Sequence, residues 1–514
     1  MAAKQAHTGL YRNWVSYLGG VIAAVGFLLV VLFMLLELSL KSPSPYIGIF
    51  TFVLFPGIIM AGIVMGLIGM RFEAKRRVRE GTTEALPYPA IDLNDPKQRR
   101  RFGVAIVVGT ILSVVFAFTG YNGFLLTESV EFCGKTCHVM KPELTAYQNS
   151  SHARVRCVDC HVGEGAGWYV HSKLSGARQL LAVTFGTYDR PIPTPVENLR
   201  PARETCQHCH WPEKFVQAQL YQRPHYRYNE ANTPEQITLL VKTGGGGENG
   251  GGIHWHMFIE NTVTYVAEDR HHQEVPWVSV KHRDGKVVEY FRQEKKINGD
   301  QLKSMKKHVM DCMDCHNRPA HNFQPPDLAV DRAMAAGSLS TSLPWMKQVA
   351  VDALSRPYPD AATAHSGMKN DVLSFYKEKY PEVAGARAKE IEKAVEGILG
   401  IYDRNVFPEM KVSWDTYPSN IGHRYWNGCF RCHDGKHVSP DGQVLRSECN
   451  ICHSDPKRGP PSGMGEVLAK AEREWHPWEI PEKHLAIKEH DKLLCSACHL
   501  AGRRPKTECK ECHN

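Results

Sequence analysis

Sixteen cysteines and 26 histidines stand out in this 514-residue sequence. All sixteen cysteines fall into eight motifs, in each of which a histidine directly follows the second of two cysteines. Seven motifs have the form Cys-x-x-Cys-His, and the first has three residues between its cysteines. In chain order, the cysteines of motifs 1 to 8 are Cys133 and Cys137, Cys157 and Cys160, Cys206 and Cys209, Cys312 and Cys315, Cys429 and Cys432, Cys449 and Cys452, Cys495 and Cys498, and Cys509 and Cys512. The histidines that follow them are His138, His161, His210, His316, His433, His453, His499 and His513.

This pattern is the attachment signal for c-type haem. The two thiols form thioethers to the haem vinyl groups, and the adjacent histidine becomes an axial ligand of the iron. A zinc site or a disulfide framework would explain paired cysteines, but neither explains a histidine after every second cysteine. The sequence therefore predicts eight covalently bound haem c groups.

Eighteen histidines lie outside the motifs. A haem with two histidine ligands needs one of them, and such low-spin irons carry electrons rather than bind substrates. The candidates for this second ligand are His152, His321 and His437, which lie close to motifs 2, 4 and 5, and His254 and His256, of which we expect at least one to be a ligand.

Three apolar runs precede the motifs, at residues 14–38, 46–70 and 102–121. Each is long enough for a membrane-spanning helix, which needs about 20 residues. Nine Lys/Arg residues lie between the second and third runs. Positive loops stay in the cytoplasm. We therefore expect a cytoplasmic N-terminus in a bacterial inner membrane and a periplasmic haem domain, in agreement with haem attachment outside the cytoplasm.

Two features of the apolar runs concern packing and chemistry. Gly62 and Gly66 form a small-xxx-small pair that favours close helix packing. Glu37 lies near the end of the first run, where it either reaches the membrane interface or serves as a proton acceptor.

Charge indicates the kind of partner. Residues 127–514 hold 50 Lys/Arg and 48 Asp/Glu, so this part of the chain lacks the excess of basic residues that nucleic-acid binding requires. Sixteen haem propionates and eight ferric irons would bring the net charge of this part to about −6. An acidic domain attracts basic partners, and small basic periplasmic multihaem cytochromes fit that role.

The fold class predicted is mainly α: three membrane helices in residues 1–126 and a periplasmic octahaem domain with little regular secondary structure and a small β insertion. Residues 127–323 form a tetrahaem module with an insertion at about 211–308, where alternation around Asp284 and Gly285 predicts strands at 261–267 and 275–291. A glycine tract at 244–252 lacks the Lys-Ser/Thr of a P-loop. Residues 324–410 form a helical spacer, with apolar residues at helical spacing from Ile391 to Tyr402, and 411–514 form a second tetrahaem module.

Residues 131–190 resemble the NapC/NirT/NrfH family of membrane-anchored quinol dehydrogenases. Cys137-His138-Val139-Met140 is similar to the family's first haem motif, and motif 4 with the trailing His321 is similar to its fourth. The resemblance implies that Met140 rather than His138 ligates the first iron, but the extra residue in motif 1 leaves that choice open. A stretch beside the first haem is implied to hold the quinol pocket and proton exit, with Lys173, Arg178, Gln179 and Asp189, and with Glu37 as a further candidate. Lys173 could equally pair with a haem propionate, and Gln179 stands where the family has an acidic residue.

The whole layout resembles the ImcH-type inner-membrane cytochromes of metal-reducing bacteria. This resemblance implies menaquinol oxidation, with electrons passed through the haems to periplasmic cytochromes and toward extracellular acceptors. One alternative is an electron conduit that a separate quinol-oxidising partner feeds. A terminal reductase for nitrite or a sulfur oxyanion is the other, and it would need an iron with an open coordination position.

Overall fold

The computed structural model describes residues 9–39, 54–81, 92–136, 138–163, 165–196, 199–211, 218–245, 252–257, 261–295, 297–454 and 456–461. Contacts divide the chain into two units. The first combines Met1–Ser129 with His161–Arg178, and the second combines Val130–Cys160 with Gln179–Asn514.

Some predicted site residues lie outside the described residues. They include Cys137 of motif 1 and the side chains of Glu37 and His138. They also include all of motifs 7 and 8, that is, the cysteines Cys495, Cys498, Cys509 and Cys512 and the histidines His499 and His513.

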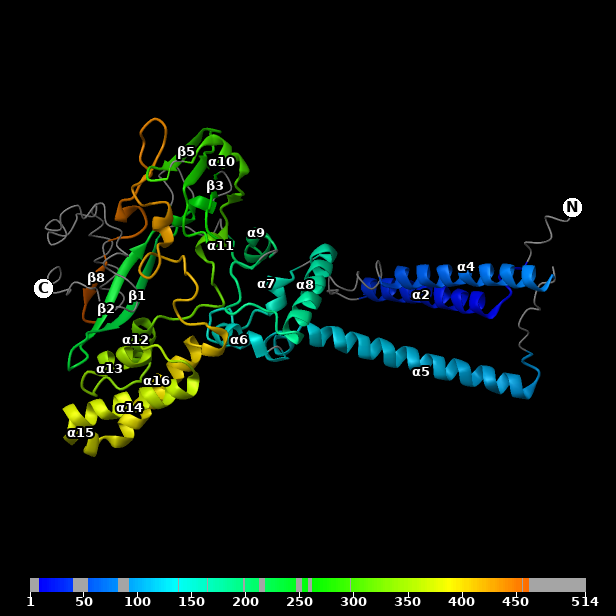
Figure 1. The fold of residues 1–514 in the computed structure, drawn as a ribbon, viewed down its shortest axis with the longest axis horizontal. Coiled ribbons are helices and arrows are strands. Elements are labelled where there is room, and N and C mark those ends of the chain that lie inside the picture. Colours follow the sequence, from blue (N-terminus) through cyan, green and yellow to red (C-terminus); the bar gives the residue numbers. More distant parts are fainter. Residues whose placement is uncertain are drawn as a thin grey trace. The chain divides into compact units, whose positions relative to one another are not determined.

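Two long apolar helices pack against each other in the first unit (Figure 1). Helix α2 spans Trp14–Ser39 and helix α4 spans Phe55–Glu80, and both are long and apolar enough to cross a membrane. A Cβ atom added to Gly62 would lie 2.6 Å from the Gly19 carbonyl oxygen, and the Ser16 hydroxyl donates to the Gly66 carbonyl at 2.9 Å. The predicted small-residue contact is confirmed, because only glycine allows the two backbones this close.

The third predicted span lies within α5, a continuous helix from Pro96 to Thr127. The Asp95 carboxylate caps its N-terminus by accepting from the Lys97 amide at 2.9 Å, and the arginines of the predicted basic loop follow in its first turns. Its 32 residues correspond to about 48 Å, more than the roughly 30 Å of a bilayer core. Among the described residues, α2 and α4 are the helices that are both long enough and apolar enough to cross a membrane. Membrane crossing by α5 therefore remains a prediction.

Short helices connect the first haem motifs. Motif 1 contains the π-helix Phe132–Thr136 and the 3-10 helix His138–Met140, followed by α6 at Lys141–Gln148. A π turn holds one residue more than an α turn, and this one contains Cys133 and the three residues that follow it. Helices α7 (Cys157–His161), α8 (Ala166–Thr184) and α9 (Ala202–Cys206) follow.

Two antiparallel sheets form the β part of the second unit (Figure 1). Strands β1 (Gln219–Tyr226), β2 (Pro234–Val241) and β8 (Lys457–Gly459) form the first sheet. The second has the order β6-β3-β4-β5-β7, with β3 at Thr262–Val266, β4 at Trp277–Lys281, β5 at Val287–Arg292, β6 at Lys307–Val309 and β7 at His437–Val438. The predicted turn joins β4 to β5, where Gly285 adopts φ 82°.

The sheets join segments that are far apart in the sequence. Residues 457–459 pair with β2, and residues 437–438 pair with β5. The β insertion and the segment after the spacer therefore share both sheets. The predicted small β insertion is thus present, and the short strands β7 and β8 from the segment after the spacer extend its two sheets.

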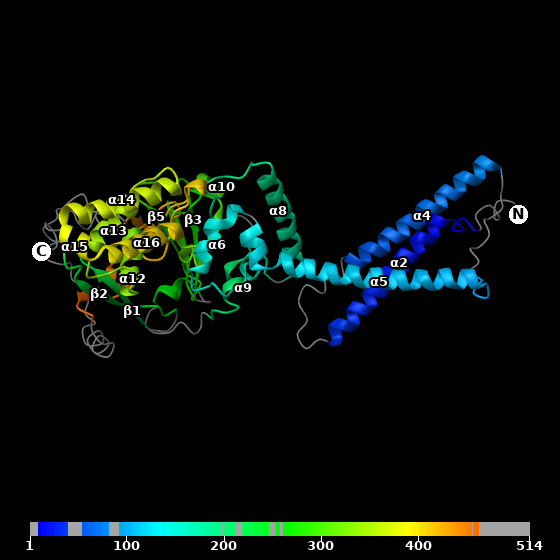
Figure 2. The same ribbon diagram turned by 90° about the horizontal axis from the view of Figure 1, so that it is seen from below.

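A helical bundle fills residues 326–405 (Figure 2). It comprises α12 (Pro326–Ala335), α13 (Met346–Leu354), α14 (Ala361–Lys379), α15 (Pro381–Ala386) and α16 (Ala388–Asn405). The apolar positions predicted on α16 are buried: Ile391, Val395, Ile398 and Tyr402 belong to the bundle core, and Leu399 packs against it. The helices inferred from their spacing are thus present, the mainly helical class is confirmed, and the role of this bundle as a spacer between two haem modules stays a prediction.

The remaining short helices are α10 at Gly299–Ser304, α11 at Cys312–Cys315, and the 3-10 turns Ile253–Met257 (η5), Pro408–Met410, Gly428–Arg431 and Cys449–Ile451. Three of them carry motif cysteines. These are α11, which holds Cys312 and Cys315, and the turns at Gly428–Arg431 and Cys449–Ile451, which hold Cys429 and Cys449.

Candidate functional site

The regular motifs share one backbone arrangement. In four of them the amide of the histidine donates to the carbonyl of the first cysteine: His210 to Cys206 and His316 to Cys312 at 2.8 Å, His433 to Cys429 at 3.0 Å and His453 to Cys449 at 3.4 Å. A helical turn places residues i, i+3 and i+4 on one face. The two thiols and the imidazole of a motif therefore point to the same side, as attachment of one haem requires.

Thiols of different motifs lie against each other. Hydrogen bonds lower the pKa of Cys157 to about 7 beside Cys133, that of Cys312 to about 7 beside Cys206, and that of Cys429 to about 7 beside Cys452. Motifs 1 and 2, 3 and 4, and 5 and 6 are thus spatial neighbours.

Two further thiol contacts complete this series. Burial raises the pKa of Cys160 in motif 2, with smaller contributions from Asp159 and from Cys209 of motif 3. Burial also raises the pKa of Cys315 in motif 4 to about 12, with a further contribution from Cys429 of motif 5. Motifs 1 to 6 therefore follow one another in space in the same order as in the chain.

The cysteines that the structure describes are free thiols rather than disulfides. Cys160 and Cys209 are exposed, and the other described motif cysteines are partly buried. Free thiols are what thioether bonds to haem need. Attachment at each of these cysteines stays a prediction, as it does for Cys495, Cys498, Cys509 and Cys512 outside the described residues.

Four motif histidines face a second imidazole. Ring centroids are 6.0 Å apart for His152 and His210, 6.4 Å for His254 and His316, 5.7 Å for His256 and His433, and 6.1 Å for His423 and His453. Metal–imidazole bonds of about 2.0 Å would place the ring centroids of two ligands on one iron roughly 6 Å apart. The residues of motifs 3 to 6 therefore fit a haem iron with two histidine ligands.

Hydrogen bonds orient these rings. The Nδ1 atoms of His254 and His256 donate to the carbonyls of Thr243 at 2.6 Å and Ile253 at 2.8 Å. The Nδ1 of His433 donates to the Arg446 carbonyl at 2.6 Å. A carbonyl can only accept, so each Nδ1 carries the hydrogen, and in the neutral ring Nε2 has the lone pair that a metal binds.

Burial favours the neutral ring. It lowers the pKa of His433 to about 4, and it lowers the pKa of His256 as well. Neutral imidazole is the form that ligates a metal. The orientation of these rings and their neutral protonation state therefore both fit iron ligation.

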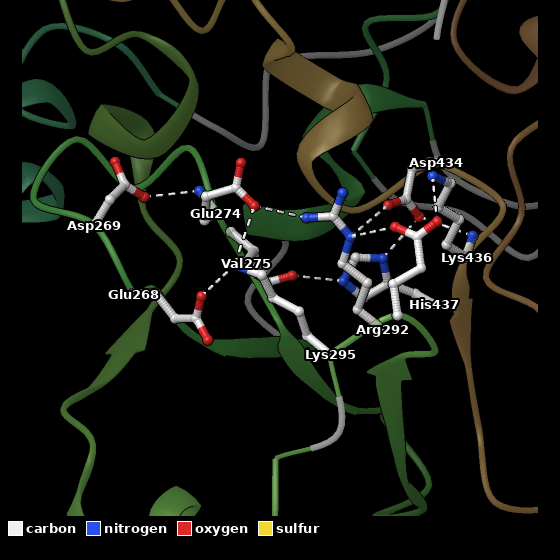
Figure 3. A network of polar contacts seen from close by, with 10 residues as sticks. Glu268, Asp269, Glu274, Val275, Arg292, Lys295, Asp434, Lys436 and His437 are labelled. Atoms are coloured by element: carbon white, nitrogen blue, oxygen red, sulfur yellow. Dashed lines mark hydrogen bonds and ion pairs between the residues drawn. The ribbon is translucent and has the colours of Figure 1, made fainter. Parts of the chain in front are cut away.

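His437 is a wrong prediction. Its Nδ1 lies 2.8 Å from the Asp434 carboxylate and its Nε2 donates to the Val275 carbonyl at 2.8 Å (Figure 3). Neither nitrogen is available to an iron, because both are used within the polar network that ties β7 to β4 and β5. His437 thus has a structural role, and its closeness to motif 5 in sequence was misleading.

His423 was missed by sequence reasoning. It lies six residues before Cys429 but faces His453 of motif 6. Its short distance from a motif was the available signal, as it was for His152. The Nδ1 of His321 donates to the Glu143 carbonyl at 3.0 Å, and its role as a ligand remains a prediction. The choice between His138 and Met140 in motif 1 also stays open.

A second feature lies at the end of α5 in the first unit. Glu128, only 5% exposed, forms an ion pair through Oε1 with Lys173 of α8. Its Oε2 is buried and has no hydrogen-bond partner among the described residues. The Lys173 ammonium also lies 4.9 Å from the centroid of the Tyr169 ring, and that ring contacts Phe124 at 6.1 Å between centroids.

The other predicted pocket residues do not join this pair. A helix turns about 100° per residue, so Arg178 and Gln179 lie on faces of α8 different from that of Lys173. Asp189 follows α8 and is exposed. Glu128 was absent from the predicted set, and its position directly after the third apolar run was the signal that could have found it.

Comparisons with known proteins identify relatives of this chain. Residues 95–193 match the NapC/NirT cytochrome c family, N-terminal region. The chain is 41% identical to the cytochrome c-type protein ImcH of Geobacter sulfurreducens over 96% of each chain. It is also 38% identical to the cytochrome c-type protein NrfH of Wolinella succinogenes over 77 residues. These 77 residues make up 14% of this chain and 44% of NrfH.

A tetrahaem c-type cytochrome of Allochromatium vinosum is 31% identical over 84 residues, 15% of this chain and 45% of that protein. No solved structure matches the chain. The match to ImcH thus extends far beyond the N-terminal region that the family model covers. With its apolar N-terminal helices and its haem c attachment motifs, the chain therefore belongs to the NapC/NirT-type family of membrane-anchored electron-transport cytochromes c.

Proposed function

We propose that this chain is an inner-membrane quinol dehydrogenase that oxidises menaquinol and passes the electrons through eight c-type haems to small basic periplasmic cytochromes. In this proposal α5 is a third membrane span, the N-terminus is cytoplasmic and the haem domain is periplasmic. Likeness to ImcH and NrfH supports an electron-transfer role in the membrane. The quinol site is proposed from the residues around Glu128.

The observation that carries the proposal is the buried carboxylate at the end of α5. One oxygen of Glu128 is paired with Lys173, and the other has no partner in the described part of the chain. A buried oxygen without a hydrogen bond costs free energy. A quinol hydroxyl is a donor that would satisfy it, and quinols reach this position from the bilayer.

The surroundings suit a lipid-soluble substrate. On α8, Val170 and Leu174 are 45% and 68% exposed although both are apolar. They lie at i and i+4, on one face of the helix, and Lys173 lies next to Leu174 in sequence. Exposed apolar side chains beside a buried ion pair are typical of a site that takes an apolar molecule with a polar head.

Oxidation of menaquinol releases two electrons and two protons. We assign Glu128 the acceptance of the two quinol protons one at a time, with release of the first to the periplasm before the second is taken. The Lys173 ammonium stabilises the negative charge that develops on the quinol oxygen as its proton leaves. The Lys173 side chain is 38% exposed and connects the Glu128–Lys173 pair to water. Haem c bound at the motifs supplies one-electron acceptors. The paired imidazoles of motifs 3 to 6 would each supply two ligands to an iron, and this favours electron transfer over a terminal reductase.

The test is anaerobic mixing of the detergent-purified holoprotein with a menaquinol analogue, followed through haem absorbance. We expect Glu128→Gln to lower the rate of quinol-driven reduction by roughly 10²–10⁴-fold, the usual contribution of a general base. Reduction by dithionite should stay normal. The matched control is Glu131→Gln, at an exposed carboxylate three residues away.

Two results would contradict the proposal. If the wild-type protein is reduced by dithionite but not by quinol, the chain is a conduit that needs a quinol-oxidising partner. If quinol reduces Glu128→Gln and Lys173→Met at the wild-type rate, the quinol site lies elsewhere.

A further inference from the structure

Two histidines of the β insertion lie two residues apart and face motif histidines on either side of the spacer. His254 faces His316 of motif 4, and His256 faces His433 of motif 5. We infer that His254 and His256 are the distal ligands of two neighbouring haems, so that one short turn ties the last haem before the spacer to the first haem after it. This inference rests on haem attachment and is independent of quinol oxidation.

The backbone of the turn explains how residues this close in sequence reach two sites. His254 and His256 lie in the 3-10 helix η5, Ile253–Met257. With three residues per turn, side chains at i and i+2 point about 120° apart. One segment of backbone can therefore present its imidazoles to two different irons.

Gly252, the last glycine before the turn, allows the turn to lie close to Lys242. The Ile253 amide donates to the Lys242 carbonyl at 2.7 Å, and a Cβ atom on Gly252 would lie 2.1 Å from that same oxygen. A side chain at position 252 cannot be accommodated at this distance. Gly252 thus lets the chain pass closely enough for the Thr243 carbonyl to accept from His254.

The two imidazole pairs differ in orientation. The rings of His254 and His316 are nearly parallel, with 3° between their planes, and those of His256 and His433 are nearly perpendicular, at 88°. The Nε2 atoms of His256 and His433 are 3.5 Å apart, close to the roughly 4 Å expected for two nitrogens on one metal. The angle between ligand planes controls the spin-resonance signal of low-spin ferric haem: parallel planes give a rhombic signal, and perpendicular planes give a highly anisotropic one.

Other contacts support the closeness of these two motifs. The Arg431 guanidinium of motif 5 donates to the Asp314 carbonyl of motif 4 at 2.6 Å. The β5–β7 pairing draws the segment after motif 5 onto the insertion. Electrons would thus cross from the module before the spacer to the module after it at this turn.

The experiment uses the holoprotein and single variants His254→Met and His256→Met. A methionine that replaces a true ligand binds iron through sulfur, produces the near-infrared band of methionine-ligated ferric haem, and raises the potential of that haem. We expect the band in both variants. His254→Met should remove a rhombic low-spin signal, and His256→Met should remove a highly anisotropic one.

The control variant is His365→Met, because His365 pairs with Asp403 on the bundle surface and faces no motif in the described part of the chain. Alanine variants add a second measurement: each should give a high-spin ferric signal equal to one haem, which added imidazole converts back to low spin. The inference is overturned if both methionine variants lack the new band and keep the wild-type low-spin signals. The assignment of the two pairs is overturned if His254→Met removes the highly anisotropic signal and His256→Met removes the rhombic one.

Discussion

Replacing Gly252 by alanine should displace both insertion histidines at once. The new Cβ atom would lie 2.1 Å from the Lys242 carbonyl oxygen and 2.6 Å from the carbonyl carbon, whereas real Cβ contacts are essentially never under 3.0 Å. Because both contact atoms belong to backbone, no side-chain rotation relieves the overlap. The turn must therefore move away from Lys242 by about 0.9 Å.

That displacement is large compared with what a metal site tolerates. Ligand distances in metal sites hold to about ±0.2 Å, so a shift more than four times greater should break or lengthen the bonds from His254 and His256. The expected result is a partly high-spin ferric spectrum that accounts for two haems, while total haem content by absorbance of the reduced protein stays at the wild-type value.

Gly299→Ala is the matched control, since a Cβ atom at Gly299 has no neighbour within 4 Å. It should leave the low-spin signals unchanged. The reasoning would be refuted if Gly252→Ala kept both low-spin signals at full intensity. A change at only one haem would refute the claim that a single rigid turn holds both ligands.

Two further predictions concern the helical bundle. Lys347 is fully buried and lies 2.7 Å from the buried carboxylate of Asp331, so Lys347→Met should remove the lysine partner of that carboxylate, leave it only its contacts with the His225 ring and the Tyr226 amide, and destabilise the protein by about 3 kcal/mol. Thermal unfolding would detect this as a lower Tm, and equal effects of Lys347→Met and the exposed Lys369→Met would contradict it. The hydrogen bond from Arg387 lowers the pKa of Glu390 to about 2 from its usual value of 4.5. The ionised Glu390 carboxylate therefore contributes its full stabilisation above pH 4.5, and this contribution is lost as the pH falls toward 2. When Tm is measured over this pH range, Glu390→Gln should show a smaller decrease in Tm on acidification than the wild-type protein.

Local chemistry explains what the sequence could predict. The haem motifs are defined within six residues or fewer, and α16 follows from apolar residues at helical spacing that packing then buries. Membrane helices α2 and α4 follow from length and apolarity. Each of these features is decided by neighbouring residues along the chain.

Long-range contacts explain what was missed. Strand β1 contains Pro224 and several polar residues, a poor β pattern, and it is fixed by pairing with β2 and by Asp331, which accepts from the Tyr226 amide at 3.0 Å. His437 was misassigned because its partner carbonyl, that of Val275, lies 162 residues away. Glu128 and Lys173 are 45 residues apart, and only the fold brings them together.

The shared sheets have a consequence for biogenesis. Strands β2 and β5 are synthesised long before their partners β8 and β7, which lie after the spacer. Until residues 437–459 emerge, both sheets present an unpaired edge, and open edges invite pairing with other chains. Maturation must therefore protect these edges during synthesis, and a chain that ends after the spacer should be prone to aggregation even though its own bundle core is complete.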